Sequence, residues 1–330
     1  MKRGGERVGK REITAGKNDA GLRLDKFLLK KYNDLPVSLM YKLIRKKDIT
    51  VNRHRTEEKY ILSEGDIIKI YAPDDVFAEK AARRKGDAAR LRVAYEDENI
   101  LIADKESGLL VHSDEGTRED TLIDRITQYL IEKGEFDPDS ENSFAPALCN
   151  RIDRNTQGLV IAAKNAQALR EMNDIVRERA VSKKYLAAVH GCPTPREGEL
   201  KFFLEKDHEK NMVFVRRSQG ANAKTAVTRY SVLEYDHKKD ISLLEIELIT
   251  GRTHQIRASF AHIGCPLVGD GKYAVNKSDR EIGYSSQSLC AYSLCFDKVS
   301  GMPALGYLQG LKVTSAEPEF LRLFRGCRKG

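Results

Sequence analysis

A carboxylate stands between two arginines at the start of a polar turn, in the segment Arg-Ile-Asp-Arg at residues 151–154. A cation on each side favours the charged form of Asp153. The turn ends at Gly158 and leads into the apolar run 159–163, which has the length and composition of a buried strand. The pattern therefore predicts a charged carboxylate on a loop that a rigid strand holds in place.

This stretch admits three interpretations. The plainest is a solvated ion pair on a surface turn, since such pairs are common and contribute little to stability. A calcium loop of the EF-hand type is excluded, because its twelfth position is Lys164, where the loop requires a glutamate. The third interpretation is a catalytic carboxylate that acts as a nucleophile or a base.

A second polar cluster reads Gly-Arg-Thr-His-Gln-Ile-Arg at residues 251–257. A solvated helix start would account for it. Two arginines, a histidine and a glutamine within six residues are also a ready set of donors to phosphate and ribose oxygens. On that interpretation we expect Arg252, His254 and Gln255 to contact a nucleic acid.

The N-terminal part carries the excess positive charge. Residues 1–92 hold 24 Lys and Arg against 14 Asp and Glu, whereas the remainder holds 33 against 35. Such asymmetry is typical of a segment that binds nucleic acid. Apolar residues at helical spacing predict one helix after Gly21 and a second after Pro36, and alternation predicts short strands around 49–52 and 67–71.

This helix-helix-strand segment resembles an S4 RNA-binding domain over residues 18–72. The resemblance rests on Arg-Leu-Asp-Lys-Phe-Leu at 23–28, Leu-Ile-Arg at 43–45, Ile-Thr-Val-Asn at 49–52 and Gly-Asp-Ile-Ile at 65–68. It implies that basic side chains of the two helices bind RNA, and these are Arg23, Lys26, Lys42, Arg45 and Lys46. Leu39 stands where the family usually has an arginine.

The remainder resembles the pseudouridine synthases of the large-ribosomal-RNA type. Residues 150–159 follow the signature His-Arg-Leu-Asp-x-x-Thr-Ser-Gly-Leu, with asparagine, isoleucine and glutamine at its first, third and eighth positions. Three further family motifs lie in the family's order: Lys-Pro-x-Gly-Leu-x-Val-His at 105–112, with glutamate for proline, Lys-Lys-Tyr-x-Ala-x-Val at 183–189, and Gly-Arg-x-His-Gln-Ile-Arg at 251–257. The last continues into Gly-x-Pro-Leu-x-Gly-Asp, and Cys290 later replaces a usual histidine.

This resemblance implies an α+β fold, with a catalytic domain built on a mixed, largely antiparallel sheet. It implies isomerisation of uridine to pseudouridine within RNA, without metal or cofactor. Asp153 would be the essential carboxylate, as a nucleophile or as the base of a glycal route, and Arg257 would be its ion-pair partner. Tyr185 would stack on the uracil, Lys184 would contact RNA, and Arg151 would fill the space left by a flipped-out nucleotide.

Two other functions compete with this one. The chain could be a non-catalytic RNA-binding factor on a synthase scaffold, although the presence of Asp153 speaks against a lost activity. It could also be a metal-dependent nuclease that uses His112, His254 and His262. No carboxylate stands at ligand spacing to those histidines, and this weakens the nuclease hypothesis.

The expected domain order is a basic flexible tail at 1–17, the S4-like domain at 18–72, a linker at 73–91 and the catalytic domain at 92–330. No run reaches the eighteen apolar residues of a membrane span, and the six cysteines form no Cys-x-x-Cys pair. We therefore expect a cytoplasmic monomer that acts on structured ribosomal RNA, with transfer RNA as the second candidate, and that has no membrane partner.

Overall fold

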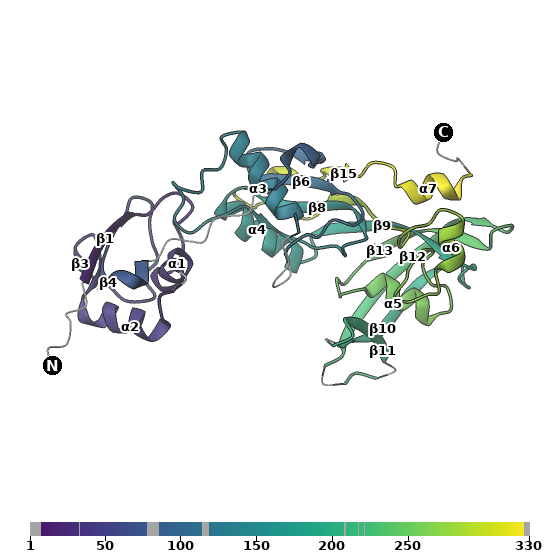
Figure 1. The fold of residues 1–330 in the computed structure, drawn as a ribbon, viewed down its shortest axis with the longest axis horizontal. Helices are drawn as coiled ribbons and strands as arrows, with labels where there is room; N and C mark the ends of the chain where they lie inside the picture. The colour runs from purple at the N-terminus through teal and green to yellow at the C-terminus, as the bar shows by residue number, and fades with distance from the viewer. Residues whose placement is uncertain are drawn as a thin grey trace. The chain divides into compact units, whose positions relative to one another are not determined.

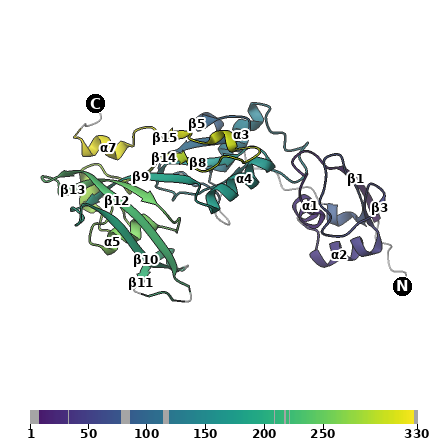
Figure 2. The same cartoon turned by 180° about the vertical axis from the view of Figure 1, so that it is seen from behind.

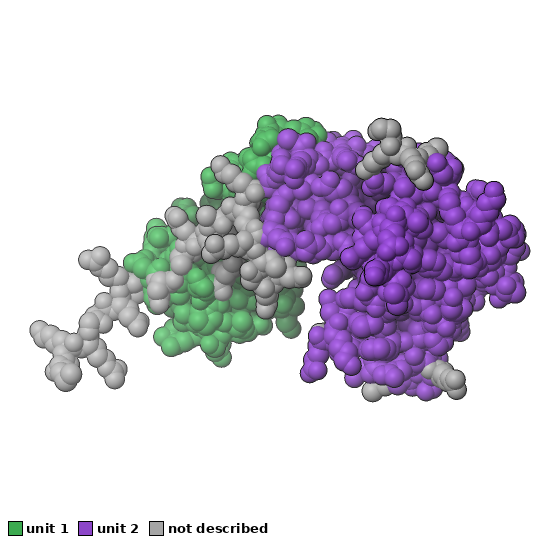
Figure 3. All heavy atoms as spheres, turned by 45° about the vertical axis from the view of Figure 1, so that its right-hand side comes forward, with its two compact units in different colours: residues 1–85, 127–146, 165–167 green, residues 86–126, 147–164, 168–330 purple. Residues whose placement is uncertain are grey.

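The computed structural model describes residues 8–32, 34–77, 86–113, 119–207, 209–216, 218–220 and 222–326. The chain divides into two compact units, coloured separately in Figure 3. Unit 1 comprises residues 1–85, 127–146 and 165–167, and unit 2 comprises residues 86–126, 147–164 and 168–330. The division departs from the expected domain order, because two segments from the middle of the chain belong to unit 1.

Unit 1 has the helix-helix-strand order that the sequence predicts. Its helices are α1 (Leu24–Lys31) and α2 (Val37–Lys46), and its strands are β1 (Val8–Thr14), β2 (Ile49–Val51), β3 (His54–Arg55) and β4 (Ile67–Pro73). The strands form one antiparallel sheet in the order β1-β4-β2-β3. Phe27 and Leu28 of α1 and Met40 of α2 are fully buried against it.

The expected flexible tail is wrong for residues 8–14, which form strand β1 along β4. Ile13 is buried in the core of unit 1, and Glu12 makes a 3.0 Å ion pair with Lys69. Charged residues are common on edge strands. They obscured the alternation of β1 in the sequence, whereas the rest of the expected tail, residues 1–7, lies outside the described residues.

The expected linker at 73–91 is also ordered at its start. A 3-10 turn at Asp74–Phe77 places Val76 and Phe77 in the core of unit 1, where the Phe77 ring lies 5.2 Å from that of Tyr32. A second 3-10 turn, Ala88–Arg90, belongs to unit 2. Val76 and Phe77 are two apolar residues within a charged segment, and so short a run did not indicate burial in the sequence.

The described part of unit 2 contains one mixed sheet of eleven strands (Figures 1 and 2). Its main path runs β11-β10-β12-β13-β9-β14-β8-β6-β5, with β15 beside β14 and β7 beside β8. The strands are β5 (Val93–Glu96), β6 (Ile100–Lys105), β7 (Ala147–Leu148), β8 (Gln157–Ala163), β9 (Val181–His190), β10 (Glu197–Asp207), β11 (Met212–Arg216), β12 (Lys224–Asp236), β13 (Ile241–Leu248), β14 (Leu289–Phe296) and β15 (Lys312–Thr314). Only the β14–β8 pair is parallel among them, which confirms the expected mixed, largely antiparallel sheet.

Five further α-helices follow β6 within the described residues, and the first of them passes from unit 2 into unit 1 at residue 127. They are α3 (Leu122–Glu132), α4 (Ala166–Arg177), α5 (Gln255–His262), α6 (Lys277–Glu281) and α7 (Glu319–Phe324). The apolar side of α4 packs on β6 and β8 through Met172 and Ile175, and α7 packs on β9 and β13 through Phe320. No helix within the described ranges is long and apolar enough to cross a membrane.

The parallel pair fixes where the Asp153 loop enters the sheet. Gly158 of β8 pairs with Ala291 of β14 and has a φ of +115°. A Cβ atom at this position would lie 2.2 Å from the Ala291 carbonyl oxygen. Only glycine therefore allows the two backbones to approach where the loop ends.

We predict that Gly158→Ala lowers the free energy of unfolding by about 2–4 kcal/mol, because it adds both backbone strain and overpacking. Chemical denaturation measures the change. Gly220→Ala is the matched control, since a Cβ atom there meets nothing within 4 Å. Equal stability of the two variants would contradict this role of Gly158.

Candidate active site

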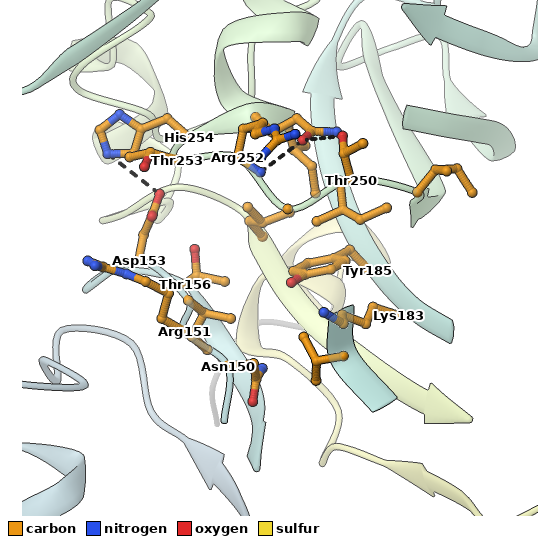
Figure 4. A pocket seen from close by; sticks show the side chains of 18 of the residues that line it. Asn150, Arg151, Asp153, Thr156, Lys183, Tyr185, Thr250, Arg252, Thr253 and His254 are labelled. Atoms are coloured by element: carbon orange, nitrogen blue, oxygen red, sulfur yellow. Dashed lines mark hydrogen bonds and ion pairs between the residues drawn. The ribbon is translucent and has the colours of Figure 1, made fainter. Parts of the chain in front are cut away.

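Unit 2 contains a pocket of about 470 Å³ that is lined by the three predicted catalytic residues, Asp153, Tyr185 and Arg257. Figure 4 labels two of them, Asp153 and Tyr185. The walls of the pocket come from the loop before β8, the end of α4, strand β9 and the loop between β13 and α5. Segments more than a hundred residues apart in sequence therefore meet at one site. The loop around Asp153 forms part of a concave wall, which disfavours the interpretation of this loop as a solvated surface turn.

Arg257 is the centre of this wall. Its Nη1 donates a 2.9 Å hydrogen bond to Asp153, while its Nε and Nη2 donate to the two carboxylate oxygens of Asp270 at 2.7 and 2.9 Å. The Tyr273 ring lies 5.2 Å from the guanidinium carbon. The guanidinium fork thus holds Asp270 with two atoms and Asp153 with one.

Burial explains why two carboxylates share one arginine. The Arg257 side chain is 9% exposed and that of Asp270 is fully buried, whereas the Asp153 side chain is 27% exposed. A buried charge is tolerated when it is paired and hydrogen-bonded. Asp270 therefore fixes Arg257 from inside the protein, and Arg257 in turn aims the accessible carboxylate of Asp153 into the pocket.

Hydrogen bonds hold the loop that carries Asp153 on both sides of this residue. Thr156 donates its backbone N–H to the Asp153 carbonyl at 3.0 Å, and its hydroxyl accepts from the buried Gln287 amide at 2.8 Å. The Asn150 side chain accepts the Ile161 backbone N–H at 2.7 Å. Asn150, which replaces the family's histidine, thus anchors the loop to β8.

A buried lysine supports the same loop from beneath. Lys105 is 1% exposed, and its ammonium group donates to the backbone carbonyls of Glu106, Leu109 and Arg154 at 2.8–2.9 Å. Burial lowers the pKa of Lys105 to about 7. Arg154 directly follows Asp153. These bonds therefore join the motif at residues 105–112 to the Asp153 loop.

Strand β9 presents alternate side chains to opposite faces of the sheet. Tyr185 and Lys183 line the pocket, and burial raises the pKa of Tyr185, so its phenol stays protonated. Lys184 does not line the pocket and makes a 2.8 Å ion pair with Glu245 of β13. Of the two adjacent lysines, the structure thus brings Lys183, not the predicted Lys184, to the site.

The predicted donors of the second cluster have different surroundings. Gln255 is 2% exposed, accepts from Thr250 and the Arg252 backbone, and donates to two groups of β12, so its amide is fully used within the protein. Arg252 is exposed at the pocket rim and donates to the Thr225 carbonyl at 3.0 Å. Gln255 shapes the loop, and Arg252 remains accessible to a ligand.

His254 lies behind Asp153 with a backbone φ of +49°. Its Nδ1 is 2.9 Å from the Tyr273 hydroxyl, and its Nε2 is 3.8 Å from an Asp153 oxygen. Burial lowers the pKa of His254 to about 4. The imidazole is therefore neutral at pH 7, and its approach to Asp153 is a contact of a neutral ring with a carboxylate.

The other predicted RNA contacts lie on exposed surfaces. Arg151 lines the pocket and is exposed. In unit 1, Lys26 of α1 and three residues of α2, Lys42, Arg45 and Lys46, are exposed. Arg23 is half-buried and makes a 2.6 Å ion pair with Asp25.

Two residues of the site were not predicted, although the sequence contains signals for them. Asp270 belongs to a recognised motif, and the rule that a buried arginine needs a buried counter-charge would have favoured it. The period of two along a strand would have favoured Lys183 over its neighbour, because Lys183 and Tyr185 share a face. No local pattern connects Tyr273 or Lys105 with Asp153.

The nuclease alternative gains no support from the described residues, among which no group of three or more His, Cys, Asp or Glu side chains could hold a metal ion. His254 and His262 stand at opposite ends of α5.

We predict that Asp270→Asn lowers the free energy of unfolding by about 3 kcal/mol at pH 7, because a buried arginine loses its main counter-charge. Burial opposes ionisation of Asp270, but the hydrogen bonds and charge of Arg257 lower its pKa below the usual 3.8. A depressed carboxyl pKa contributes stability that is complete above pH 3.8 and lost as the pH falls through the lowered value.

The stability difference between wild type and Asp270→Asn should therefore shrink below pH 3.8, as measured by denaturation across pH. Glu199→Gln is the control, because its 3.1 Å pair with Arg229 is exposed and such pairs contribute little. A difference that does not change with pH would contradict the charged Arg257–Asp270 pair.

Comparisons with known proteins place the chain in a family. The chain matches the RNA pseudouridylate synthase family over residues 99–262 and the S4 domain over residues 22–68. It is 30% identical to an uncharacterized RNA pseudouridine synthase of Bacillus subtilis, YlyB, over 87% of this chain and 89% of the relative. It is 31% identical to the ribosomal large subunit pseudouridine synthase C of Pasteurella multocida, over 86% of this chain and 85% of the relative.

Solved structures show the same fold. The human RNA pseudouridylate synthase domain containing 4 superposes with a TM-score of 0.56 at 22% identity, over 72% of this chain and 93% of that one. The human domain containing 1 gives a TM-score of 0.52 at 21% identity, over 75% and 98%. The sequence relatives establish the family, and the chain belongs to the RNA pseudouridine synthases, in a form that carries an N-terminal S4 domain.

Proposed function

We propose that this synthase converts specific uridines of large-subunit ribosomal RNA to pseudouridine, with Asp153 as the essential carboxylate and with the target nucleotide flipped out of its stack. The observation that carries the proposal is the arrangement of Asp153, whose carboxylate is held by Arg257 and still exposed to a pocket. The choice of ribosomal RNA draws on the relatives named for that substrate.

The chemistry requires a charged oxygen near the sugar. The bond between C1′ and uracil N1 breaks, the base rotates, and a new bond joins C5 to C1′ with loss of the C5 proton. Asp153 would either attack C1′ or remove the 2′ proton to form a glycal. Both routes use the carboxylate that Arg257 orients, and a charged oxygen held in advance at the pocket surface suits both.

Tyr185 suits a stacking platform for the extruded base. It is 7% exposed and lines the pocket, and base stacking on an aromatic ring contributes about 1–3 kcal/mol. The exposed Arg151 precedes Asp153 by two residues and would occupy the space that the flipped nucleotide leaves. Asp153, Arg257 and Tyr185 belong to one chain, so a monomer suffices for this reaction. The proposed compartment is the cytoplasm.

The S4-like segment, residues 18–72, would supply affinity. Its exposed lysines and arginine on α1 and α2 suit phosphate oxygens, which carry most of the salt-dependent binding to a nucleic acid. Residues 92–330 would carry the chemistry, since every residue of the pocket lies in unit 2.

We predict that Asp153→Asn abolishes pseudouridine formation while RNA binding persists. Asparagine is nearly isosteric with aspartate but lacks the charge, the nucleophilic oxygen and the capacity to take up a proton. Single-turnover conversion of ribosomal RNA transcripts, read by mass spectrometry of nucleosides after chemical labelling, measures activity. Filter binding measures affinity, which loss of an anion beside several cations should maintain or strengthen.

Asp236→Asn serves as the control, because Asp236 lies at the end of β12 outside the pocket and pairs with groups of its own turn. It should retain wild-type conversion. A folded Asp153→Asn protein that forms pseudouridine at the wild-type rate would overturn the proposed role of this carboxylate.

We further predict that replacing Lys42, Arg45 and Lys46 together by alanine weakens RNA binding and flattens its salt dependence. Each lost phosphate contact lowers the slope of log affinity against log salt by about 0.7–0.9, so three contacts lower it by about 2–3. Binding titrations at several salt concentrations measure the slope. Turnover at saturating RNA is the internal control and should stay unchanged, whereas an unchanged slope would contradict binding by α2.

A further inference from the structure

The ion-paired group at the centre of the pocket wall carries a net negative charge. Arg257 contributes one positive charge, and its partners Asp153 and Asp270 contribute two negative ones. His254 beside them is neutral at pH 7, because burial lowers its pKa to about 4. The reaction nevertheless releases uracil as an anion when its glycosidic bond breaks, and this anion needs a positive neighbour.

Lys183 is placed to provide that charge. It precedes Tyr185 by two residues on β9, so both side chains project from the same face of the strand and both line the pocket. Figure 4 shows the Lys183 ammonium group beside the Tyr185 ring, directed the same way as the phenol hydroxyl. A base stacked on Tyr185 would therefore have an ammonium group at its edge.

Lys183 is half-buried and makes no hydrogen bond or ion pair with its side chain among the described residues. By contrast, Lys184 pairs with Glu245, Arg252 donates to a backbone carbonyl, and Arg151 is exposed. Burial lowers the pKa of Lys183. Withdrawing an ammonium group from water without a partner costs free energy. A ligand oxygen that accepted a hydrogen bond from Lys183 would offset this cost.

We propose that Lys183 is a catalytic residue whose ammonium group binds a carbonyl oxygen of the target uracil and stabilises the negative charge on the departing base. When the C1′–N1 bond breaks, its electron pair moves onto the uracil ring and is shared with O2 and O4. C1′ is then either bonded to the Asp153 carboxylate or, after loss of the 2′ proton to that carboxylate, part of a glycal. Lys183 exchanges no proton in this step. The proposed role of Lys183 rests on the proposed function.

The other ligand oxygen within reach of such a lysine is a phosphate. A phosphate contact would act on affinity in the ground state, whereas stabilisation of the uracil anion acts on the rate of bond cleavage. The ratio between the loss of rate and the loss of affinity therefore separates the two roles.

The test compares Lys183→Met with Lys312→Met, a matched lysine that is exposed on β15 and does not line the pocket. We expect Lys183→Met to lower the single-turnover rate on uridine RNA about 100-fold, as for loss of one preorganised charge-stabilising group, with RNA affinity changed less than about threefold. Lys312→Met should stay within about twofold of wild type in rate. Lys183→Gln, which keeps a donor but no charge, should fall between the two and provides a second variant should methionine prevent folding.

A second substrate tests the charge directly. Fluorine at C5 makes uracil a more acidic, better leaving group, so cleavage of 5-fluorouridine depends less on a neighbouring cation. Disappearance of the 5-fluorouridine nucleoside, measured by mass spectrometry, should show a wild-type to Lys183→Met rate ratio about tenfold smaller than for uridine, in keeping with differential stabilisation of the transition state.

Equal rate ratios for the two substrates would overturn the proposal and leave Lys183 a structural role. A loss of affinity without a loss of rate would also overturn it, in favour of a phosphate contact. Wild-type protein that forms no pseudouridine in the uridine RNA would instead refute the proposed function, so the two failures are distinguishable.

Discussion

One buried arginine that is shared by two carboxylates determines the rest of the site. Asp270 holds Arg257 through two hydrogen bonds within the protein, and the remaining arm of the guanidinium holds Asp153 at the pocket surface. Neither carboxylate alone could do both, because a buried arginine needs a buried counter-charge while a reactive oxygen must stay accessible. Helix α5, which carries Arg257, and the turn after Gly269, which carries Asp270, are therefore constrained by the chemistry as much as by packing.

The sheet gives this ion pair its fixed relation to Tyr185. Strand β14 lies between β9, which carries Tyr185, and β8, which follows the Asp153 loop. The close approach of β8 and β14 depends on Gly158. Asn150 and Lys105 then hold the two ends of the loop by bonds to backbone atoms. A rigid sheet thus positions groups that a flexible surface turn could not hold.

Much of this was predictable from sequence, and the exceptions have physical causes. Asp153, Tyr185 and Arg257 were predicted because each lies in a recognisable motif, and the structure brings them into one pocket. Lys184 was predicted as an RNA contact from the family resemblance and Gln255 from its residue type. Neither argument says which face of a strand a side chain occupies or whether an amide already has its hydrogen-bond partners. Strand β1 was missed because its partner, β4, lies more than fifty residues away and its own residues are charged. Long-range pairing of this kind leaves no local signal.

A crystal structure of the Asp153→Asn variant bound to its RNA substrate would test the account most directly. The account predicts that the target uridine lies outside its stack, with its base on the Tyr185 ring and its C1′ about 3–3.5 Å from the side chain of residue 153, the separation of a near-attack geometry. The Arg257–Asp270 hydrogen bonds should be intact. A target uridine that remains stacked in the RNA, or that binds away from this pocket, would contradict it.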